Sequence, residues 1–335
     1  MQFDSPLRVT WTAGPASPFA RVAAALAEAG VMEVALSAPL GVVRGQAAEV
    51  AGLARTSRVE LVVDAGELAD GRGWPALEDV LTSGIPAALT FDFTSVPKGP
   101  AAGLLARLSH LKQAGPPVPL AIAARPDAAN LERVLRLASL AAQAGVAEVK
   151  LLHPELAGRP AGRTYSPLSP AALARAQALF PAGWPFPSCR LLVHDLFLGR
   201  VLLGDGPSSA YGGCQAGGAM AHVDEEGRVY PCSAFPVVVG DLNEHDLQSI
   251  WDAEALENVR RRLAEPPGVC AGCTSSGVCR GGCRGLSWAL SGSWDGRDPA
   301  CSGPEWPQGR VNATSATSPG STARETSETP PEESR

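Results

Sequence analysis

Short apolar runs and segments of helical periodicity alternate over the first half of the chain. Six runs have the apolar character of strands, at residues 7–11, 34–36, 59–63, 88–93, 119–123 and 146–152. Five segments between them place apolar residues at helical spacing, at residues 18–30, 46–54, 77–81, 101–114 and 130–144. Strands separated by helices predict a parallel sheet with right-handed crossovers. Periodicity leaves two α/β architectures open, a doubly wound open sheet and a partial barrel.

The pattern changes after residue 165. A helix is predicted over residues 169–180, because Ser169 and Pro170 provide a start signal. Residues 191–193 and 200–203 have the pattern of two paired short strands, and a longer helix is predicted over residues 247–263. From residue 304 the composition changes to Ser, Thr, Pro, Gly and Glu. Such a segment cannot bury enough apolar surface to fold, so residues 304–335 are predicted to be disordered.

Seven of the eight cysteines lie in the segment from Cys214 to Cys301. Their pattern is C-x12-G-x4-C, then C-x2-C-x5-C-x3-C, then a last cysteine, at Cys214, Gly227, Cys232, Cys270, Cys273, Cys279, Cys283 and Cys301. Thiols at short, loop-like spacings among glycines are typical of a metal site. Thiolates select soft metals, which leaves zinc, copper(I) and iron–sulfur clusters.

Two features favour iron–sulfur clusters over zinc. Zinc sites with four thiolates usually take their ligands from two separated pairs, whereas the four cysteines from Cys270 to Cys283 lie within fourteen residues. In two-cluster ferredoxins a similar run of four cysteines sends its last member to the other cluster. A structural zinc site remains the alternative.

Composition and charge limit the classes of partner. The net charge of -6 and the lack of a long basic run argue against nucleic acid. The N-terminal residues do not place a charged segment before an apolar one, and no window approaches the roughly 20 apolar residues of a membrane helix. We therefore expect no membrane partner and a cytoplasmic protein, in which cysteines stay reduced instead of forming disulfides.

The segment from Cys214 to Cys301 resembles the SPASM domain, the auxiliary-cluster domain of many radical SAM enzymes. All seven cysteine positions of the family pattern are filled, and residues 227–232 read G-R-V-Y-P-C, similar to the family's G-x-V-Y-P-C turn. Residues 240–242 and 249–251 resemble the family's connecting segment. The resemblance implies a partial (β/α)6 TIM-like barrel over residues 1–165 and connecting elements over 166–205. A small, loop-rich iron–sulfur domain would then occupy residues 206–303.

The resemblance also implies two [4Fe-4S] clusters and their ligands. Cys214, Cys232 and Cys283 would hold the first cluster. The second cluster would have four cysteine ligands, which are Cys270, Cys273, Cys279 and Cys301. The first then lacks a fourth cysteine. Met220, Cys189 or an open iron are the three possibilities for that position.

The chain departs from the radical SAM pattern before the cysteine-rich segment. Radical SAM enzymes carry C-x3-C-x2-C in the loop after the first strand, whereas residues 12–17 here read T-A-G-P-A-S. No cysteine precedes Cys189, and residues 36–39 read L-S-A-P where the family has the Gly-Gly-Glu motif that holds the amino group of S-adenosylmethionine. We therefore expect no binding of S-adenosylmethionine and no cleavage of it by this chain alone.

These features resemble SPASM proteins of the GeoRSP type, which implies an accessory protein that acts beside a separate radical SAM enzyme. The implied roles are electron relay or substrate presentation during maturation of a peptide or natural product. A peptide substrate or a peptide-chaperone protein would be a further partner. Two alternatives remain: an enzyme with chemistry at the incomplete first cluster, and a zinc-stapled binding module.

Other candidate residues carry weaker signals. Asp64 and Asp92 end the third and fourth predicted strands, where barrel active sites usually lie, but capping of the next turn is the favoured role. The five histidines have neither metalloprotease nor catalytic-triad spacing; they are His110, His153, His194, His222 and His245. No glycine-rich phosphate-binding motif is present.

Overall fold

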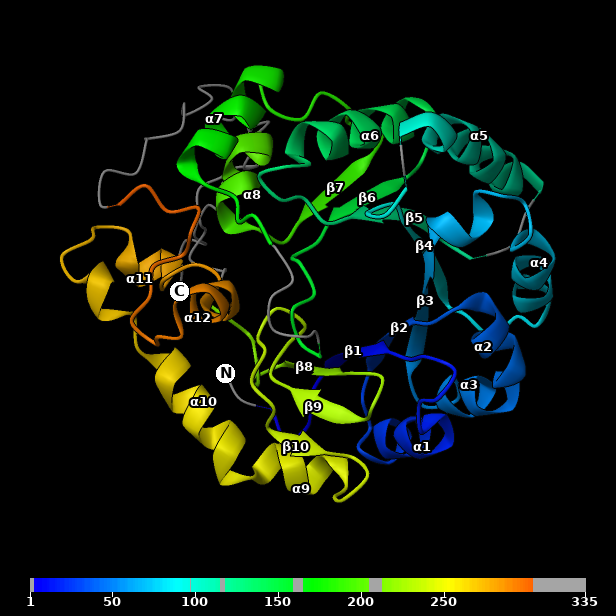
Figure 1. The fold of residues 1–335 in the computed structure, drawn as a ribbon, viewed down its shortest axis with the longest axis horizontal. Coiled ribbons are helices and arrows are strands. Elements are labelled where there is room, and N and C mark those ends of the chain that lie inside the picture. The colour runs from blue at the N-terminus through cyan, green and yellow to red at the C-terminus, as the bar shows by residue number, and fades with distance from the viewer. Residues whose placement is uncertain (1–2, 97, 115–117, 159–164, 205–212, 304–335) are drawn as a thin grey trace, which may run out of the picture.

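The computed structural model describes residues 3–96, 98–114, 118–158, 165–204 and 213–303. The segment predicted to be disordered, residues 304–335, lies outside these ranges. A curved sheet with strand order β10-β9-β8-β1-β2-β3-β4-β5-β6-β7 organises the molecule (Figure 1). Every neighbouring pair from β8 through β1 to β7 is parallel, whereas β9 and β10 add antiparallel strands at one edge. The fold is therefore the predicted α/β class with a parallel sheet.

The strand bounds agree with the six predicted runs and extend the sheet at both ends. The strands are β1 (Arg8–Thr12), β2 (Glu33–Ser37), β3 (Arg58–Asp64), β4 (Ala88–Asp92), β5 (Leu120–Ala124), β6 (Glu148–Leu151), β7 (Arg190–Val193), β8 (Met220–Val223), β9 (Arg228–Tyr230) and β10 (Gly240–Asp241). Strands β8 to β10 come from the cysteine-rich part of the chain. That part is therefore joined to the barrel through backbone hydrogen bonds.

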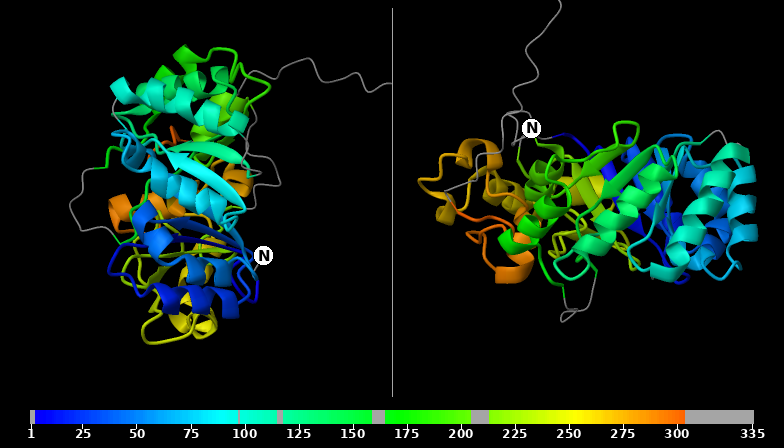
Figure 2. Two further views of the ribbon diagram at one scale, coloured as in Figure 1. Left: turned by 90° about the vertical axis from the view of Figure 1, so that its right-hand side faces the viewer. Right: turned by 90° about the horizontal axis from the view of Figure 1, so that it is seen from above.

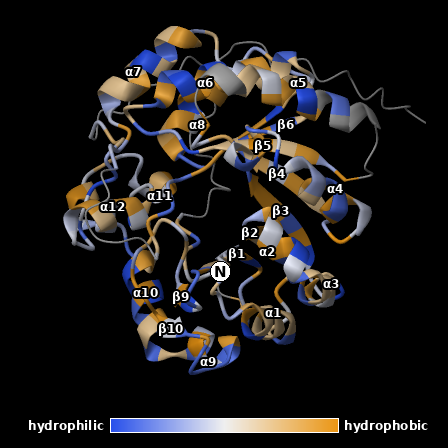
Figure 3. Ribbon diagram, turned by 45° about the vertical axis from the view of Figure 1, so that its right-hand side comes forward, coloured by the Kyte–Doolittle hydropathy of each residue, from blue (hydrophilic) through white to orange (hydrophobic). Residues whose placement is uncertain are grey.

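Helices follow most strands and cover the outer face of the sheet (Figure 1). The first group is α1 (Phe19–Glu28), α2 (Leu40–Gly45), α3 (Ala47–Leu53), η1 (Ala65–Leu68), α4 (Trp74–Thr82), α5 (Lys98–Ala114) and α6 (Leu131–Gln143). The second group is α7 (Pro170–Leu179), α8 (Leu196–Leu203), α9 (Leu247–Asp252), α10 (Glu254–Ala264), η3 (Gly268–Cys270), α11 (Ser276–Cys279) and α12 (Arg284–Ser291). Figure 3 shows hydrophobic residues along the strands and mixed colours on the helices, as expected for helices with one buried face.

The two faces of the sheet differ in character because side chains alternate along each strand. On β1, Val9 and Trp11 are fully buried, and the Trp11 ring lies 4.4 Å from that of Phe19 on α1. These residues face the helices. Arg8, Thr10 and Thr12 occupy the alternate positions of β1, so polar groups line the inner face. A polar inner face can position functional groups, whereas a fully apolar barrel centre is only a packed core.

Two of the predicted elements are wrong. Residues 200–203, predicted as a strand, form the end of α8. The side chain of Asp195 caps this helix by accepting hydrogen bonds from the backbone N–H groups of Phe197 and Leu198, and Gly204 ends it with φ of 76°. The helix predicted over residues 247–263 is interrupted at Ala253, whose ψ of 147° is extended and separates α9 from α10.

The cysteine-rich segment occupies the space between the two edges of the sheet. Its strand β8 pairs with β1, with His222 opposite Thr10. Figure 1 shows α11 and α12 between α8 and α10, and Figure 2 shows them at the end of the molecule opposite α4 and α5. The cysteine-rich segment thus lies beside the barrel and close to α8 (Figure 1).

Candidate metal centre

The structure brings Cys214, Cys232 and Cys283 together as a first thiol set. Cys214 precedes β8, Cys232 follows β9, and Cys283 directly precedes α12. Burial and then Cys283 raise the pKa of Cys214 to about 11, and burial and then Asp298 raise that of Cys283 to about 12. Burial, Cys214 and Cys283 raise the pKa of Cys232 well above its ordinary value. Each thiol in this set is close enough to another member to affect its charge.

Backbone N–H groups surround the sulfurs of this first thiol set. Ala216 and Arg284 present their N–H groups to Cys214, and Ala234 and Phe235 present theirs to Cys232. The first turn of α12 serves Cys283 in the same way, because helix N-termini leave N–H groups without intrahelical partners. These contacts lower the pKa of each thiol against the larger effect of burial. They are suited to sulfurs that carry negative charge.

Cys270, Cys273, Cys279 and Cys301 form a second thiol set around one pocket. The pocket is completed by other side chains, including Phe197 from α8 and Asp298. Burial is the first cause that raises the pKa of Cys270, followed by Cys301 and Cys273. Burial also raises the pKa of Cys279, to about 11. The four sulfurs that the SPASM resemblance assigns to one cluster therefore share one pocket, although they come from 32 residues of chain between 270 and 301.

A tight backbone turn joins the two thiol sets. Arg280, Gly281 and Gly282 have φ values of 50°, 92° and 67°, and the N–H groups of both glycines face the sulfur of Cys279. Successive residues of this kind form concave N–H groups that favour an anion. The carboxylate of Asp298 accepts a hydrogen bond of 2.6 Å from the N–H of Cys283. Asp298 thus lines the pocket of the second set and fixes a member of the first.

Gly282→Ala is expected to destabilise this turn and to lower cluster content. An alanine Cβ would lie 2.4 Å from Oδ2 of Asp298, and the φ of 67° is unfavourable for any side chain. We expect a loss of about 1–3 kcal/mol in the free energy of unfolding. Denaturant unfolding and iron content would measure it.

Gly272→Ala is the matched control for that substitution. Gly272 also has positive φ, 77°, but a Cβ there has nothing within 4 Å. It should therefore show the cost of backbone strain alone and a smaller effect than Gly282→Ala. Equal effects would mean that the contact with Asp298 does not matter.

The donor set fits iron–sulfur clusters. Seven sulfurs converge in two groups, and four of those sulfurs have backbone N–H groups facing them, a feature that tunes Fe–S sites. Within the described ranges, no three His, Cys, Asp or Glu side chains stand at the spacing of a single-ion site. A cubane cluster binds its thiolates at separate corners of an Fe4S4 body, so its ligands stand further apart than those of one ion.

Cys189 and Met220 are the two candidate side chains for a fourth ligand of the first set. Cys189 is 3% exposed and directly precedes β7. Its Sγ lies 3.9 Å from the carbonyl oxygen of Arg190, and its own carbonyl accepts a hydrogen bond from the Trp184 indole. Burial and then Glu148 raise its pKa. Met220 is the first residue of β8, opposite Arg8 on β1. These contacts place Cys189 in the packing around β7.

The sequence did not reveal a polar network across the carboxyl end of the strands. Thr12 at the end of β1 donates a 2.9 Å hydrogen bond to Glu155, which follows β6. Arg125, which follows β5, pairs with Asp92 and reaches Glu155 at 3.5 Å. β1 and β6 are not neighbours in the sheet, so the contact between Thr12 and Glu155 crosses the mouth of the barrel. Beside it, a Cβ on Gly14 would lie 2.7 Å from the Glu225 carboxylate.

A second buried network lies deeper on the inner face. Nζ of Lys150 is 2.5 Å from Oε1 of Glu60, and Thr90 donates a 2.6 Å hydrogen bond to the same oxygen. Burial raises the pKa of Glu60, but Lys150 and Thr90 outweigh it and the pKa is lowered overall. Glu60 is therefore ionised at neutral pH. The sequence shows which positions of one strand are apolar, but it does not show that Glu60 and Lys150, from different strands, form an ion pair.

The candidate carboxylates at strand ends do cap turns. Oδ1 of Asp64 accepts hydrogen bonds from the N–H of Gly66 at 2.8 Å and from Ser95 at 2.7 Å. Asp92 accepts one from the N–H of Thr94 at 2.9 Å, in addition to pairing with Arg125. The favoured capping role is thus confirmed for both.

Two of the five histidines meet at the barrel mouth. The rings of His153 and His194 lie 6.2 Å apart, and burial and then His153 lower the pKa of His194 to about 3. His194 is therefore neutral at neutral pH. His222 is buried on β8 with Nδ1 2.9 Å from Oγ1 of Thr10. His110 and His245 are exposed.

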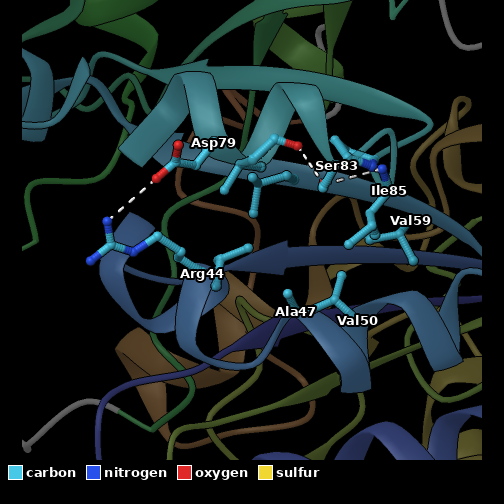
Figure 4. Close-up of a pocket in the computed structure, with 11 residues that line it drawn as sticks. Arg44, Ala47, Val50, Val59, Asp79, Ser83 and Ile85 are labelled. Carbon is cyan, nitrogen blue, oxygen red and sulfur yellow. Dashed lines mark hydrogen bonds and ion pairs between the residues drawn. The ribbon is translucent and has the colours of Figure 1, made fainter. Parts of the chain in front are cut away.

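A separate apolar pocket lies on the outer side of the sheet, among α2, α3, α4 and β3 (Figure 4). Val50 and Val59 are two of its apolar walls, and an exposed ion pair of 3.4 Å between Arg44 and Asp79 crosses its rim. No cysteine lines this pocket. It is a gap in helix packing and has no part in the metal centre.

In the part of the chain that the structure describes, no helix has the length and apolar character needed to cross a bilayer.

The fold and the two thiol sets define a class of protein: an α/β barrel joined to a cysteine-rich segment with two groups of thiols. Residues 214–274 match the family model of SPASM, an iron–sulfur cluster-binding domain. The match includes four of the seven clustered cysteines and stops before Cys279. A SPASM domain is therefore present, and such domains bind iron–sulfur clusters.

Several curated proteins are similar to parts of the chain. The AdoMet-dependent heme synthase of Methanosarcina barkeri is 32% identical over 27% of this chain and 25% of its own length. The PqqA peptide cyclase of Methylocella silvestris is 25% identical over 55% of this chain and 50% of its own length. The mycofactocin maturase MftC of Mycolicibacterium smegmatis is 33% identical over 33% and 30%. The chain spans half or less of the length of these relatives.

The solved structure of Streptococcus suis SuiB has a similar fold. The TM-score is 0.61 at 14% identity, and the alignment covers 89% of this chain and 77% of SuiB. The likeness therefore extends over the barrel as well as the cysteine-rich segment.

Proposed function

We propose that this chain is an accessory iron–sulfur protein that carries two [4Fe-4S] clusters and acts with a separate radical SAM enzyme. Residues 1–165 would carry the first six strands of the barrel, 166–205 would add β7 and connect, and 206–303 would carry the clusters together with β8 to β10. Cys214, Cys232 and Cys283 hold the first cluster, and the second thiol set holds the second. When bound, the clusters supply one-electron transfer. The chain's own residues hold them and present a surface to the partner.

The observation that carries the proposal is the loop after β1. In radical SAM enzymes three cysteines of this loop hold the cluster that binds S-adenosylmethionine, and residues 12–17 contain no thiol. The loop is instead a compact turn, in which Oγ of Ser17 accepts a 2.8 Å hydrogen bond from the N–H of Gly14. Hydroxyl and backbone groups are too hard as ligands to replace thiolates at an iron–sulfur cluster.

The barrel mouth supports the same proposal. Thr12, Glu155 and Arg125 link side chains across the opening that S-adenosylmethionine would enter. Breaking a partly buried charge pair by inserting a ligand is costly unless the ligand replaces the lost contacts. The protein's own side chains therefore bridge the mouth, and a ligand that entered there would have to replace these contacts.

The relatives support a role in peptide or natural-product maturation. One is a peptide cyclase and another a maturase, and they align with 55% and 33% of this chain. A peptide substrate, or a protein that delivers one, is therefore the partner we expect besides the radical SAM enzyme.

A second candidate function rests on the first thiol set. It brings together three cysteines, and the groups that act on Cys283 include Asp298 and Asp195. A cluster held by three thiolates has one iron with a free coordination position, so it could bind and transform a small ligand. Cleavage of S-adenosylmethionine by the reduced protein alone would separate this enzyme from the accessory protein.

Metal analysis tests the iron–sulfur part of the proposal. Two cubanes contain about eight iron and eight sulfide in total, which we expect per chain after anaerobic reconstitution. The brown protein should absorb near 400 nm. Stoichiometric zinc without sulfide in protein purified without oxygen would instead indicate the zinc-stapled module.

A further inference from the structure

Arg284 is a buried cation at the junction of the two thiol sets. It is 3% exposed and is the first residue of α12, directly after Cys283. Nη1 donates a 2.7 Å hydrogen bond to the carbonyl of Glu265. Nη2 donates to the carbonyls of Trp294 at 2.7 Å and Arg262 at 3.4 Å. The side chain therefore ties α12 to the end of α10 and to the loop before Cys301.

All three of these acceptors are neutral backbone carbonyls. A buried charge is costly unless an opposite charge compensates it, because carbonyl dipoles replace only part of the lost hydration. The carboxylate that acts on Arg284 is that of Asp295, which is exposed and therefore screened by water. Among the described residues, the hydrogen bonds explain the geometry of the guanidinium, but no buried carboxylate balances its charge.

Arg284 lies beside members of both thiol sets. Its backbone N–H faces the Cys214 sulfur, and its Cδ would lie 3.1 Å from a Cβ on Gly281, whose own N–H faces the Cys279 sulfur. Cys214 and Cys270 also raise the pKa of Arg284 against the larger effect of burial. Cys214 belongs to the first set and Cys270 to the second. Arg297 also acts on Cys270, but it is exposed. Arg284 is thus a buried cation that both sets share.

We infer that Arg284 is the fixed counter-charge of both clusters and raises the reduction potential of each. The inference rests on the proposed occupancy of both thiol sets by clusters. A cubane with thiolate ligands is anionic and becomes more so on reduction, so a nearby buried cation stabilises the reduced form more than the oxidised form. One side chain then biases the potentials of both clusters in the same direction.

The test compares three variants, Arg284→Gln, Arg284→Lys and the surface control Arg261→Gln. Each is reconstituted anaerobically and analysed for iron and sulfide. The reduction potentials are then measured by a redox titration that is monitored by electron paramagnetic resonance. Arg261 is exposed and pairs with Asn258, so its loss removes one positive charge away from the thiol sets. In Arg284→Gln we expect the reduced-to-oxidised ratio of both clusters to fall about tenfold at a fixed potential, which is about 59 mV for a one-electron couple. Arg284→Lys and Arg261→Gln should stay near wild type.

The outcomes distinguish a counter-charge role of Arg284 from a purely structural role. Loss of iron in Arg284→Gln with retention in Arg284→Lys would also support the counter-charge. Unchanged potentials in Arg284→Gln, or equal shifts in the glutamine and lysine variants, would overturn it. Equal loss of iron in both would assign Arg284 a purely structural role and overturn it as well. Failure of the proposed clusters themselves would be seen separately, as wild-type protein without iron and sulfide.

Discussion

Cys273→Ala is expected to remove about half of the iron and sulfide bound per chain. Cys273 shares one pocket with the other three sulfurs of the second set. Alanine offers no donor, and the nearby Ser275 and Ser276 hydroxyls are poor substitutes for a thiolate. The first set draws on three different cysteines, so its cluster should remain. Iron and sulfide per chain, measured against wild type after the same anaerobic reconstitution, would give the ratio.

Cys189→Ala is the matched control. It removes one buried thiol of the same size, but from the packing around β7, where its carbonyl is held by Trp184. We expect full iron content and a loss of roughly 1 kcal/mol in stability from the missing side-chain contacts. If Cys189→Ala lowered the iron content by half, Cys189 would be the fourth ligand of the first cluster and the assignment of an incomplete site would be wrong.

The assignment of the cysteines to two sets follows from the resemblance to the SPASM pattern and stays a prediction, and short turns account for only part of it, because Cys283 lies four residues after Cys279 but is assigned to the other set. Cys270, Cys273 and Cys279 lie within ten residues, and the glycines between Cys279 and Cys283 supply the positive φ values that turn both sulfurs inward. The parallel sheet could also be predicted, because strands and helices each have a characteristic periodicity of apolar residues. Features that depend on a few neighbouring residues can therefore be predicted from the sequence.

The error at α8 has a local cause. Residues 196–203 are almost wholly apolar, and a short apolar run does not distinguish a buried strand from a buried helix. The deciding signals were the capping carboxylate of Asp195 and Gly204 at the other end. A helix here matters for the site, because Phe197 of α8 lines the pocket of the second thiol set.

The network at the barrel mouth could not be predicted from periodicity. Thr12 and Glu155 are 143 residues apart and meet only because β1 and β6 curve toward each other. Arg284 presents the same difficulty, since an arginine next to a cysteine has no sequence signal for 3% exposure. Both features depend on how distant elements pack. They are also the features that bear most directly on what the chain can do.

The reduced, reconstituted protein alone is expected not to cleave S-adenosylmethionine. Reductive cleavage needs an electron passed from a cluster to a sulfonium that is held on an open iron. Residues 12–17 offer no thiolate for that cluster, and the Thr12–Glu155 hydrogen bond spans the position beside the loop. The measurement is formation of 5′-deoxyadenosine after incubation of dithionite-reduced protein with S-adenosylmethionine.

The remaining route to cleavage is an open iron at the first thiol set, and two variants isolate it. Should the wild type turn over repeatedly, Cys283→Ala would abolish the activity and Cys273→Ala would spare it if the first cluster is the site. Repeated turnover would thus replace the accessory role with catalysis at the incomplete cluster. We expect no turnover by the chain alone, and modified peptide only after a radical SAM enzyme is added, because the loop after β1 has no thiol and side chains bridge the barrel mouth.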